Sequence, residues 1–574
     1  MTLTRPNIAD KSQYLALLVL AAVAVLAYAP ALHAPWYLDD YPAIVNNAQI
    51  RNLSWTIADF FTQRGLVTLS LALNLRFFGM ETFSFHLVNL LLHLTTTGFV
   101  LLCLRRVFVS TWHWPIIGAA IFALHPLQTQ AVTYIVQRAT SLSALFLFMA
   151  LYCYIKAVEE QTAAEKPKKQ SLFYAGCLLS GALAVTTKQN TATLPLLLLV
   201  FDYFFLARAQ RFPWRKKLVY VAPLFIAPAL VAVLMLLLPT LSGENWQTIS
   251  NFEPLNAAGD ITPLTYLATE FSVFWIYLRL FPLPIHQVLD YGYPFAASLF
   301  ALKPLLALTG IVALFSAAYF LRRRWPCALF FLTWMVLSLA VESSFIPLDP
   351  IFEHRLYIPL FGFSILLTDL LARASRKSPG ATLAAGLALL AVFATLSYKR
   401  NEVWNKPLKL YAGDVDHGYG SYRSLMMLAD SQFRAGEREA AKTSYDRAVA
   451  RIEKEGLSRA GSKMLVNLAI AYGRFDDFGQ AEKLLRLALE KDPRSPQAHY
   501  NLGVAYYLQN RHREALQHFT ITYELQPGNA HALFYYLLLS ARFKRDIDYQ
   551  GLLDELSRQD RNLAIKLRGK LPAF

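Results

Sequence analysis

The chain has 574 residues, of which 55% are hydrophobic and 16% charged, whereas about a quarter are charged in ordinary soluble domains. This composition excludes an ordinary soluble protein and predicts a polytopic membrane protein with some soluble mass attached. The formal net charge of +16 does not indicate a nucleic-acid partner, because Lys and Arg gather in short loops between apolar runs, as in cytoplasmic loops. No cysteine falls in the polar C-terminal part, so no disulfide framework is expected there.

Eleven apolar runs are long enough to cross a bilayer, which takes roughly 17–25 residues. They begin near residues 14, 83, 114, 140, 171, 192, 217, 300, 326, 356 and 381. The first run, Tyr14 to Leu32, has no convincing small-residue cleavage site, and we interpret it as a retained signal anchor. Another run, Leu264 to Phe281, contains Glu270 and Arg279, so we expect a re-entrant or interfacial helix there.

Basic clusters give the expected orientation of these runs. With eleven crossings, the clusters at 105–106, 166–169, 211–217, 322–324 and 373–377 all face the cytoplasm. Asp39, Asp40 and everything after about Tyr398 then lie outside. Compact loops and one short repeat array favour a bacterial inner membrane, with these acids and the C-terminal part on the periplasmic side.

The polar C-terminal part repeats itself. A set of small and large apolar positions recurs 34 residues later, namely Leu468, Tyr472, Ala481, Leu485, Ala488 and Pro493 as Leu502, Tyr506, Ala515, Phe519, Thr522 and Pro527. This is the tetratricopeptide repeat (TPR) pattern, which predicts stacked helix pairs that often bind peptides; a purely stabilising or dimerising role stays open. We expect an all-α protein with a membrane domain over residues 1–398, a linker over 399–418 and a TPR α-solenoid over 419–574.

Costly polar residues gather on the outer face of the predicted membrane domain. They follow several different apolar runs, and they are Asp39, Asp40, Arg64, His125, Gln137, Arg138, Lys188, Glu353, His354 and Arg355. Each also has a simpler interpretation: Lys188 reaches the interface along its stem, and Glu353 pairs with Arg355 or Arg138. The stripe His86, Asn89 and His93 is more typical of hydrogen bonding between helices than of a metal site.

The set of residues suits one kind of chemistry. A carboxylate pair at a membrane surface supplies a general base, and nearby cations stabilise a phosphate leaving group. A phosphate held at the membrane surface indicates a lipid-linked sugar donor. No Walker-type or dinucleotide glycine loop is present, and no His/Cys cluster has zinc spacing.

Six segments carry a family resemblance: "YLDDYPAIVNN", "RGLVTLSLALN" with "FHLVNLLLH", "HPLQTQAVTYIVQR", "TKQNTATLPLLLLVFDY" and "FEHRLYIPLFG", in that order and before the repeats. Together they resemble the transmembrane-and-TPR-repeat protein O-mannosyltransferases and their bacterial homologues, of the GT-C glycosyltransferase superfamily. The resemblance implies a GT-C fold and transfer of a sugar from a polyprenyl-phosphate donor to Ser/Thr hydroxyls of an exported protein, which the TPR array helps to bind.

The resemblance also assigns roles to residues. It places the catalytic carboxylate in the acidic pair, with Asp40 as the preferred base and Asp39 orienting or sharing the proton, an order that stays open. Arg138, Lys188, His354 and Arg355 are the candidates for the donor phosphate, with Glu353 holding one of these bases and Arg64, Gln137 and His125 in support. Gln130 stands where the family usually has an acid. We expect no required metal or other cofactor, with a divalent cation left open.

Other functions are compatible with parts of the sequence. The acceptor is a glycolipid or a cell-wall polymer in one alternative. In a second, the chain is a membrane scaffold that binds partners through its TPR array. A transporter for lipid-linked saccharides should show polar groups near mid-membrane and repeats between its halves, and neither is clear here.

Overall fold

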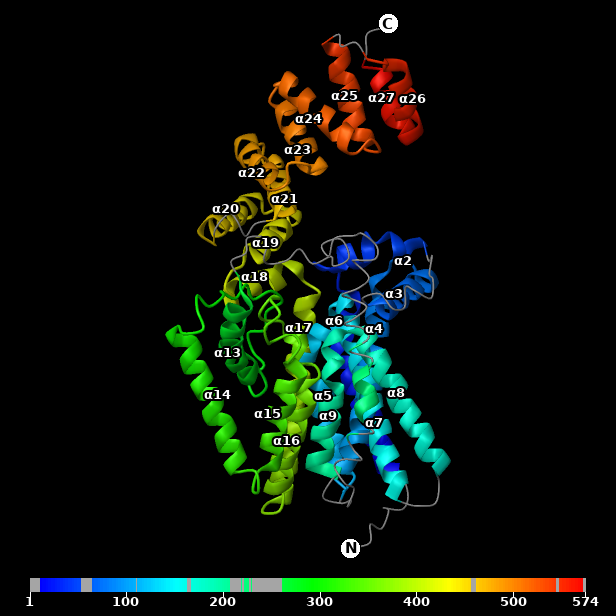
Figure 1. The fold of residues 1–574 in the computed structure, drawn as a ribbon, viewed down its shortest axis with the longest axis vertical. Coiled ribbons are helices and arrows are strands. Elements are labelled where there is room, and N and C mark those ends of the chain that lie inside the picture. The colour runs from blue at the N-terminus through cyan, green and yellow to red at the C-terminus, as the bar shows by residue number, and fades with distance from the viewer. Residues whose placement is uncertain are drawn as a thin grey trace. The chain divides into compact units, whose positions relative to one another are not determined.

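The computed structural model of the chain describes residues 11–52, 64–109, 111–162, 167–206, 218, 221–226, 229, 261–455, 461–543 and 547–570. These residues form helices and loops without a strand, so the all-α prediction is confirmed. They divide into two compact units, one ending at Gly420 and the other beginning at Ser421. Figure 1 shows the helices of each.

The first unit holds the apolar helices. Its α-helices are α1 (Lys11–Tyr28), α2 (Ala48–Asn52), α3 (Gly65–Phe78), α4 (Thr82–Val107), α5 (His113–Leu124), α6 (Thr129–Thr133), α7 (Arg138–Thr162), α8 (Pro167–Thr187), α9 (Leu194–Phe201), α13 (Pro263–Leu280), α14 (Leu302–Phe320), α15 (Pro326–Leu339), α16 (Pro359–Ala374), α17 (Pro379–Trp404) and α18 (Pro407–His417). Short 3₁₀ or π turns join them, namely η1 (Ala29–His33), η2 (Tyr41–Val45), η4 (Pro126–Gln128), η5 (Ile135–Gln137), η6 (Gln189–Thr193), η7 (Asp202–Leu206), η8 (Ala222–Phe225) and η9 (Glu353–Leu356).

Six helices of the described part are long and apolar enough to cross a membrane: Ser12–His33, Thr82–Val107, Ile135–Glu160, Gln189–Leu206, Leu302–Phe320 and Pro379–Trp404. The pair His113–Leu124 and Pro126–Thr133, bent by 50°, makes a seventh if it is one broken span. The eleven predicted crossings are therefore not confirmed. Helices α15 and α16 have only 14 and 16 residues, α8 begins with charged and polar residues, and the run from 217 lies largely outside the described residues.

Helix α13 covers the doubtful run and is not among the six; its re-entrant or interfacial placement stays a prediction. The packed interior of the unit joins α4 to α5 and α7, α15 to α16, and α1 to α17. The polar stripe on α4 makes hydrogen bonds between helices, as expected: His93 Nδ1 lies 2.7 Å from the Tyr357 hydroxyl, and Asn89 accepts a bond from Arg138 at 2.7 Å.

The segment expected as a linker is helical. Helix α17 continues to Trp404, and α18 follows after two residues, with Leu410, Tyr411 and Asp414 buried in the first unit. The apolar run ends near residue 398, so hydropathy alone does not predict that the helix continues to Trp404. The functional division at 398 and 419 stays a prediction.

The second unit is a row of helix pairs. Its helices are α19 (Tyr422–Arg434), α20 (Arg438–Glu455), α21 (Ser462–Gly473), α22 (Phe478–Lys491), α23 (Pro496–Leu508), α24 (His512–Leu525), α25 (Ala530–Arg542), α26 (Tyr549–Gln559) and α27 (Arg561–Arg568). The small repeat positions are buried where the helices of a pair meet. At Gly503 an added Cβ would lie 2.9 Å from the Phe519 ring, so only glycine allows this approach.

Candidate functional site

The two acids lie in a tight loop after the first apolar helix. The loop runs from the end of η1 to η2, and Leu38 within it has φ 34°, a left-handed conformation that is strained for a leucine. Strain of this kind persists only where the surroundings fix the chain. The side chains of Asp39 and Asp40, which follow Leu38, differ in their environment: Asp39 is exposed and Asp40 is buried.

The Asp40 carboxylate is fully buried. One oxygen accepts the Tyr37 backbone N–H at 3.0 Å, and the other accepts the Val136 N–H at 2.8 Å. Burial raises the pKa of Asp40 to about 8, against these two hydrogen bonds and the positive charge of Arg138. Both oxygens are used in holding the loop to η5.

The Asp39 side chain, in contrast, is exposed. Its backbone N–H donates to the Tyr134 hydroxyl at 2.8 Å. The Tyr134 ring stacks on Trp404 with centroids 5.9 Å apart, and the Tyr37 hydroxyl donates to the Trp404 carbonyl. The loop is thus fixed by backbone and ring contacts that leave the Asp39 carboxylate free to meet another molecule.

Arg138, predicted to bind the donor phosphate, is a fully buried brace. Its guanidinium donates to the side-chain oxygens of Asn89 at 2.7 Å and Asn74 at 2.9 Å, and to the carbonyls of Ser70 and Phe85, both at 3.1 Å. These bonds tie α3 and α4 to the start of α7. Four of its five N–H groups are thus used on protein oxygens, and the side chain has no exposed surface.

Lys188 forms the centre of a second polar group. Its ammonium lies 2.9 Å from Glu342 and donates to the Thr140 hydroxyl at 3.1 Å. Burial lowers the pKa of Lys188, although the negative charge of Glu342 opposes this shift. Burial alone would raise the pKa of Glu342, but the positive charges of Lys188 and Arg355 outweigh burial, so the pKa of Glu342 is lowered. The two groups therefore form a buried ion pair.

Arg355 adds a second cation to this group. Two of its nitrogens donate to the carbonyls of Pro350 at 3.0 Å and Asp349 at 2.7 Å, while Nε is buried without a partner. Glu270 of α13 lies within its electrostatic reach, and burial raises the pKa of Glu270 to about 7. The positive charge of Arg64, which has φ 62°, also acts on Lys188 and Glu342.

One short segment connects the two groups. Tyr134 contacts Asp39, Val136 contacts Asp40, and Thr140 contacts Lys188. Gln137, predicted as a supporting residue, accepts from the Thr140 hydroxyl at 2.9 Å. The acids and the cations are thereby attached to opposite ends of residues 134–140.

Two residues of the "EHR" segment differ from their predicted roles. Glu353 accepts from Gln287 at 2.8 Å, from the Val288 N–H at 2.7 Å and from Tyr291 at 2.8 Å, where the loop after α13 folds over it. Within the described residues, these hydrogen bonds go to none of the four bases that it was predicted to hold. His354 stacks on Phe352, and burial and the nearby Lys188 and Arg355 lower its pKa well below the ordinary value. A neutral imidazole is a poor partner for a phosphate.

Two further polar residues are structural. His125 bonds the Phe281 carbonyl at 2.8 Å through Nε2. Gln130 donates to the Leu289 carbonyl at 3.2 Å and accepts the His354 N–H at 2.6 Å. A carboxylate at this position would lack the donor for Leu289, so the glutamine fits its surroundings.

The candidate residues chosen from the sequence do not include Tyr134, Trp404 and Glu270, which the structure places beside them. Tyr134 lies within a segment chosen for its charged and amide residues, and Trp404 lies in the expected linker. Glu270 did carry a signal, because an acid that interrupts an apolar run needs a partner or a role. Within the described ranges, no group of three or more His, Cys, Asp or Glu side chains is placed to hold a metal ion.

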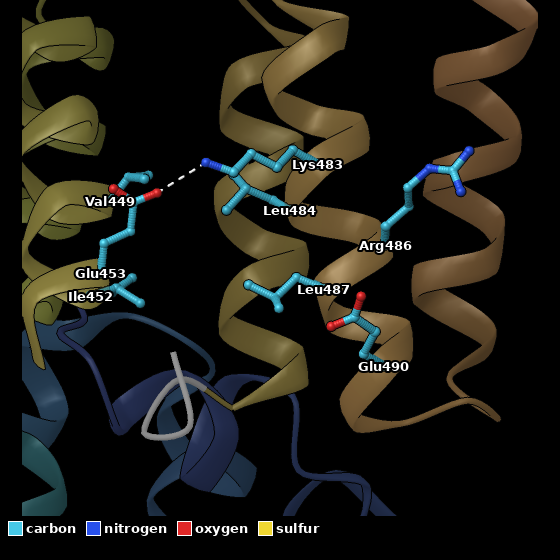
Figure 2. Close-up of a pocket in the computed structure, with 8 residues that line it drawn as sticks. All are labelled: Val449, Ile452, Glu453, Lys483, Leu484, Arg486, Leu487 and Glu490. Atoms are coloured by element: carbon cyan, nitrogen blue, oxygen red, sulfur yellow. Dashed lines mark hydrogen bonds and ion pairs between the residues drawn. The ribbon is translucent and has the colours of Figure 1, made fainter. Parts of the chain in front are cut away.

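The second unit has a pocket of its own, with a volume of about 280 Å³ (Figure 2). Its walls come from α20 and α22: Val449, Ile452, Leu484 and Leu487 are apolar, and Glu453, Lys483, Arg486 and Glu490 are charged. Glu453 and Lys483 form an ion pair across it at 3.0 Å. An apolar floor with charges of both signs suits a peptide segment.

The second unit should lose stability in mild acid. His499 and His518 face each other with their Nδ1 atoms 2.9 Å apart, and burial together with His499 and Arg486 lowers the pKa of His518 to about 4, against Glu514 and Glu482. The unfolded chain binds this proton near pH 6.5, so the stabilising contribution is complete above that pH and is lost as pH falls toward 4.

Hydrogen exchange of the full chain, followed by mass spectrometry, checks this expectation. Peptides from α23 and α24 should exchange faster at pH 4.5 than at pH 7 after correction for intrinsic rates, and a His518→Asn variant should show a smaller difference. An equal pH response in the variant would contradict the assignment.

The described helices define an all-α chain with apolar helices of membrane-spanning length and a TPR array. Tetratricopeptide repeat family models match residues 466–530 and 423–451, which confirms the repeat prediction.

Among relatives, the protein O-mannosyl-transferase TMTC1 of Mus musculus is 33% identical over 207 residues, covering 32% of this chain and 22% of the relative. TMTC2 of Homo sapiens is 30% identical over 208 residues, covering 34% and 24%. The Caenorhabditis elegans protein O-mannosyl-transferase F38B6.6 is 23% identical over 427 residues, covering 70% and 57%. These relatives confirm the predicted resemblance, and the chain spans less than two thirds of the length of each.

Two solved structures are also similar. ArnT from Cupriavidus metallidurans bound to undecaprenyl phosphate is 15% identical with a TM-score of 0.37, covering 86% of this chain and 80% of that one. The Archaeoglobus fulgidus oligosaccharyltransferase tethered with an acceptor peptide is 13% identical with a TM-score of 0.38, covering 77% and 59%.

Proposed function

We propose that the chain is a membrane glycosyltransferase with a GT-C fold. It moves a sugar from a polyprenyl-phosphate donor to a Ser/Thr hydroxyl of an exported protein, on the periplasmic side of a bacterial inner membrane. The observation that carries the proposal is the exposed Asp39 carboxylate on a fixed, strained loop, attached through residues 134–140 to a group of buried cations. The similarity to protein O-mannosyl-transferases supports the reaction class.

In this proposal the transfer is a single displacement with inversion. The acceptor oxygen bonds to the anomeric carbon from the face opposite the lipid phosphate, the bond from that carbon to the phosphate oxygen breaks, and the hydroxyl proton passes to Asp39. Asp39 takes the role of base in place of Asp40, whose two oxygens are occupied by backbone N–H groups.

Lys188 and Arg355, with Arg64, stabilise the charge that develops on the leaving phosphate. Three cations act on one region there, against the acids Glu342 and Glu270. Because Lys188 already has an acidic partner, the phosphate shares this cation with Glu342. The donor lipid lies along the apolar helices, and the chain needs no soluble nucleotide.

The TPR unit binds the acceptor protein in this account. Its pocket between α20 and α22 offers an apolar floor and paired charges to an extended segment. Holding the acceptor raises its effective concentration, which lowers the acceptor KM without changing the chemical step.

A donor panel tests the proposed reaction. Purified full chain is mixed with radiolabelled polyprenyl-phosphate mannose, glucose or a pentose and with an extract of exported proteins. We expect labelled protein from at least one donor, and no labelled protein with Asp39→Asn. Labelled glycolipid or polymer instead of protein would show that the acceptor is not a protein. The absence of a labelled product from every donor would contradict the proposal.

Tyr134 should act as a positioning residue for Asp39. A Tyr134→Phe substitution removes the hydroxyl that holds the Asp39 N–H but keeps the ring on Trp404. One hydrogen bond is worth about 1 kcal/mol, so we expect kcat to fall roughly five- to tenfold while the donor KM stays unchanged. Exposed Tyr41 of the same loop gives the control Tyr41→Phe, which should match the native enzyme. A raised donor KM with normal kcat would assign Tyr134 to binding instead.

A further inference from the structure

A groove of about 520 Å³ lies between α1 and α4, far from the acidic loop. Helix α1 contributes Gln13, Tyr14 and Leu17, and α4 contributes Thr95, Gly98, Phe99, Leu101, Leu102 and Arg105. The groove lies at the start of α1, whereas Asp39 follows its end, and 18 helical residues span about 27 Å. This groove is therefore not part of the proposed transferase site.

The groove is open because α4 has a glycine in its wall. A Cβ added at Gly98 would meet no heavy atom within 4 Å, and Tyr14 on the opposite wall is 60% exposed. Both helices are apolar enough to cross a membrane. In a bilayer, an apolar hollow between two such helices is filled by hydrocarbon at less cost than by water.

The charge at one end of the groove selects the ligand. Arg105 is exposed and makes no ion pair with an acid of the described residues, whereas its neighbour Arg106 is paired with Glu159 at 2.6 Å. From Thr95 to Arg105 the helix rises about 15 Å, which is half of a hydrocarbon core of about 30 Å. The groove thus has the length of one leaflet, with Arg105 at its headgroup end and no acid of the described residues paired with it.

We propose that this groove binds one anionic phospholipid from the leaflet on the Arg105 side. An acyl chain lies against Gly98, and the phosphate lies at Arg105. Such a lipid would link the start of α1 to the end of α4 and would be retained more firmly than the lipids around the other helices.

Native mass spectrometry of the full chain tests the proposal. Delipidated protein in detergent is titrated with palmitoyl-oleoyl phosphatidylglycerol or with the zwitterionic phosphatidylcholine of the same chains. Gly98→Leu places a side chain in the groove, where a Cβ meets no heavy atom within 4 Å, and Arg105→Gln removes the cation. Gly380→Leu and Arg323→Gln are the matched controls, because both residues are exposed and lie outside the groove.

We expect one phosphatidylglycerol to be retained by the native chain and by both controls. Gly98→Leu should weaken its binding at least tenfold, and Arg105→Gln should abolish the preference over phosphatidylcholine. Equal retention of the two lipids by the native chain would overturn the proposal. Loss in Gly380→Leu equal to that in Gly98→Leu would also overturn it, since the lipid would then be a general surface ligand. Unchanged melting temperatures show that the variants are folded.

Discussion

Asparagine at Asp39 should lower kcat for sugar transfer by about 10²–10⁴-fold while the melting temperature stays unchanged. The side chain is exposed, so the substitution breaks no packing, and its carboxylate is the acid of the pair that can take a proton from an acceptor hydroxyl. The measurement is the initial rate of transfer by purified protein at saturating donor and acceptor, beside a thermal unfolding curve.

The matched control is the neighbouring acid. In Asp40→Asn an NH₂ group replaces one of the two oxygens that accept the N–H groups of Tyr37 and Val136, so we expect a loss of stability of roughly 1–3 kcal/mol. Activity should then fall in parallel with folded protein. Normal kcat in Asp39→Asn, together with an inactive but stable Asp40→Asn, would restore Asp40 as the base.

Removal of the Arg138 guanidinium should destabilise the first unit by about 3–5 kcal/mol, since four oxygens lose their donor inside the protein. Arg138→Met keeps the length of the side chain and isolates the loss of the hydrogen bonds. Thermal unfolding in detergent measures the change, with exposed Arg76 on α3 as the control Arg76→Met, which should alter stability by less than about 0.5 kcal/mol.

The opposite result would also be informative for Arg138. An Arg138→Met protein that unfolds at the native temperature but has a much higher donor KM would show that this arginine binds the phosphate, as the sequence resemblance implies. The structure favours the brace, because the four hydrogen bonds of the guanidinium all end on protein oxygens.

The sequence predicted the broad architecture well. Apolar runs and the 34-residue period identify the membrane helices and the repeats, because both depend on local patterns of residue size and polarity. The number of crossings was harder to predict. Helices such as α15 and α16 are apolar but short. The apolar runs read from the sequence include residues of the adjoining loops, so the runs are longer than the helices.

The site was predicted as a set of segments rather than as a set of roles. Polar residues that are costly to bury marked the loops that the proposed site uses, but their partners depend on contacts distant in sequence. Arg138 and Asn74, or Glu353 and Val288, are more than sixty residues apart, and no pattern in one sequence pairs them. Likewise, Asp39 and Asp40 are equivalent in sequence, and only the backbone around Leu38 makes one exposed and the other buried.

The most direct test of the central claim compares exported proteins from two strains, one with the native chain and one with Asp39→Asn. Both chains must first be shown to accumulate equally in the membrane. We expect one or a few exported proteins to be lighter in the variant strain by the mass of a sugar residue, as measured on intact proteins. Identical protein masses in both strains, with unchanged lipid and polysaccharide fractions, would contradict the assignment of Asp39 to sugar transfer.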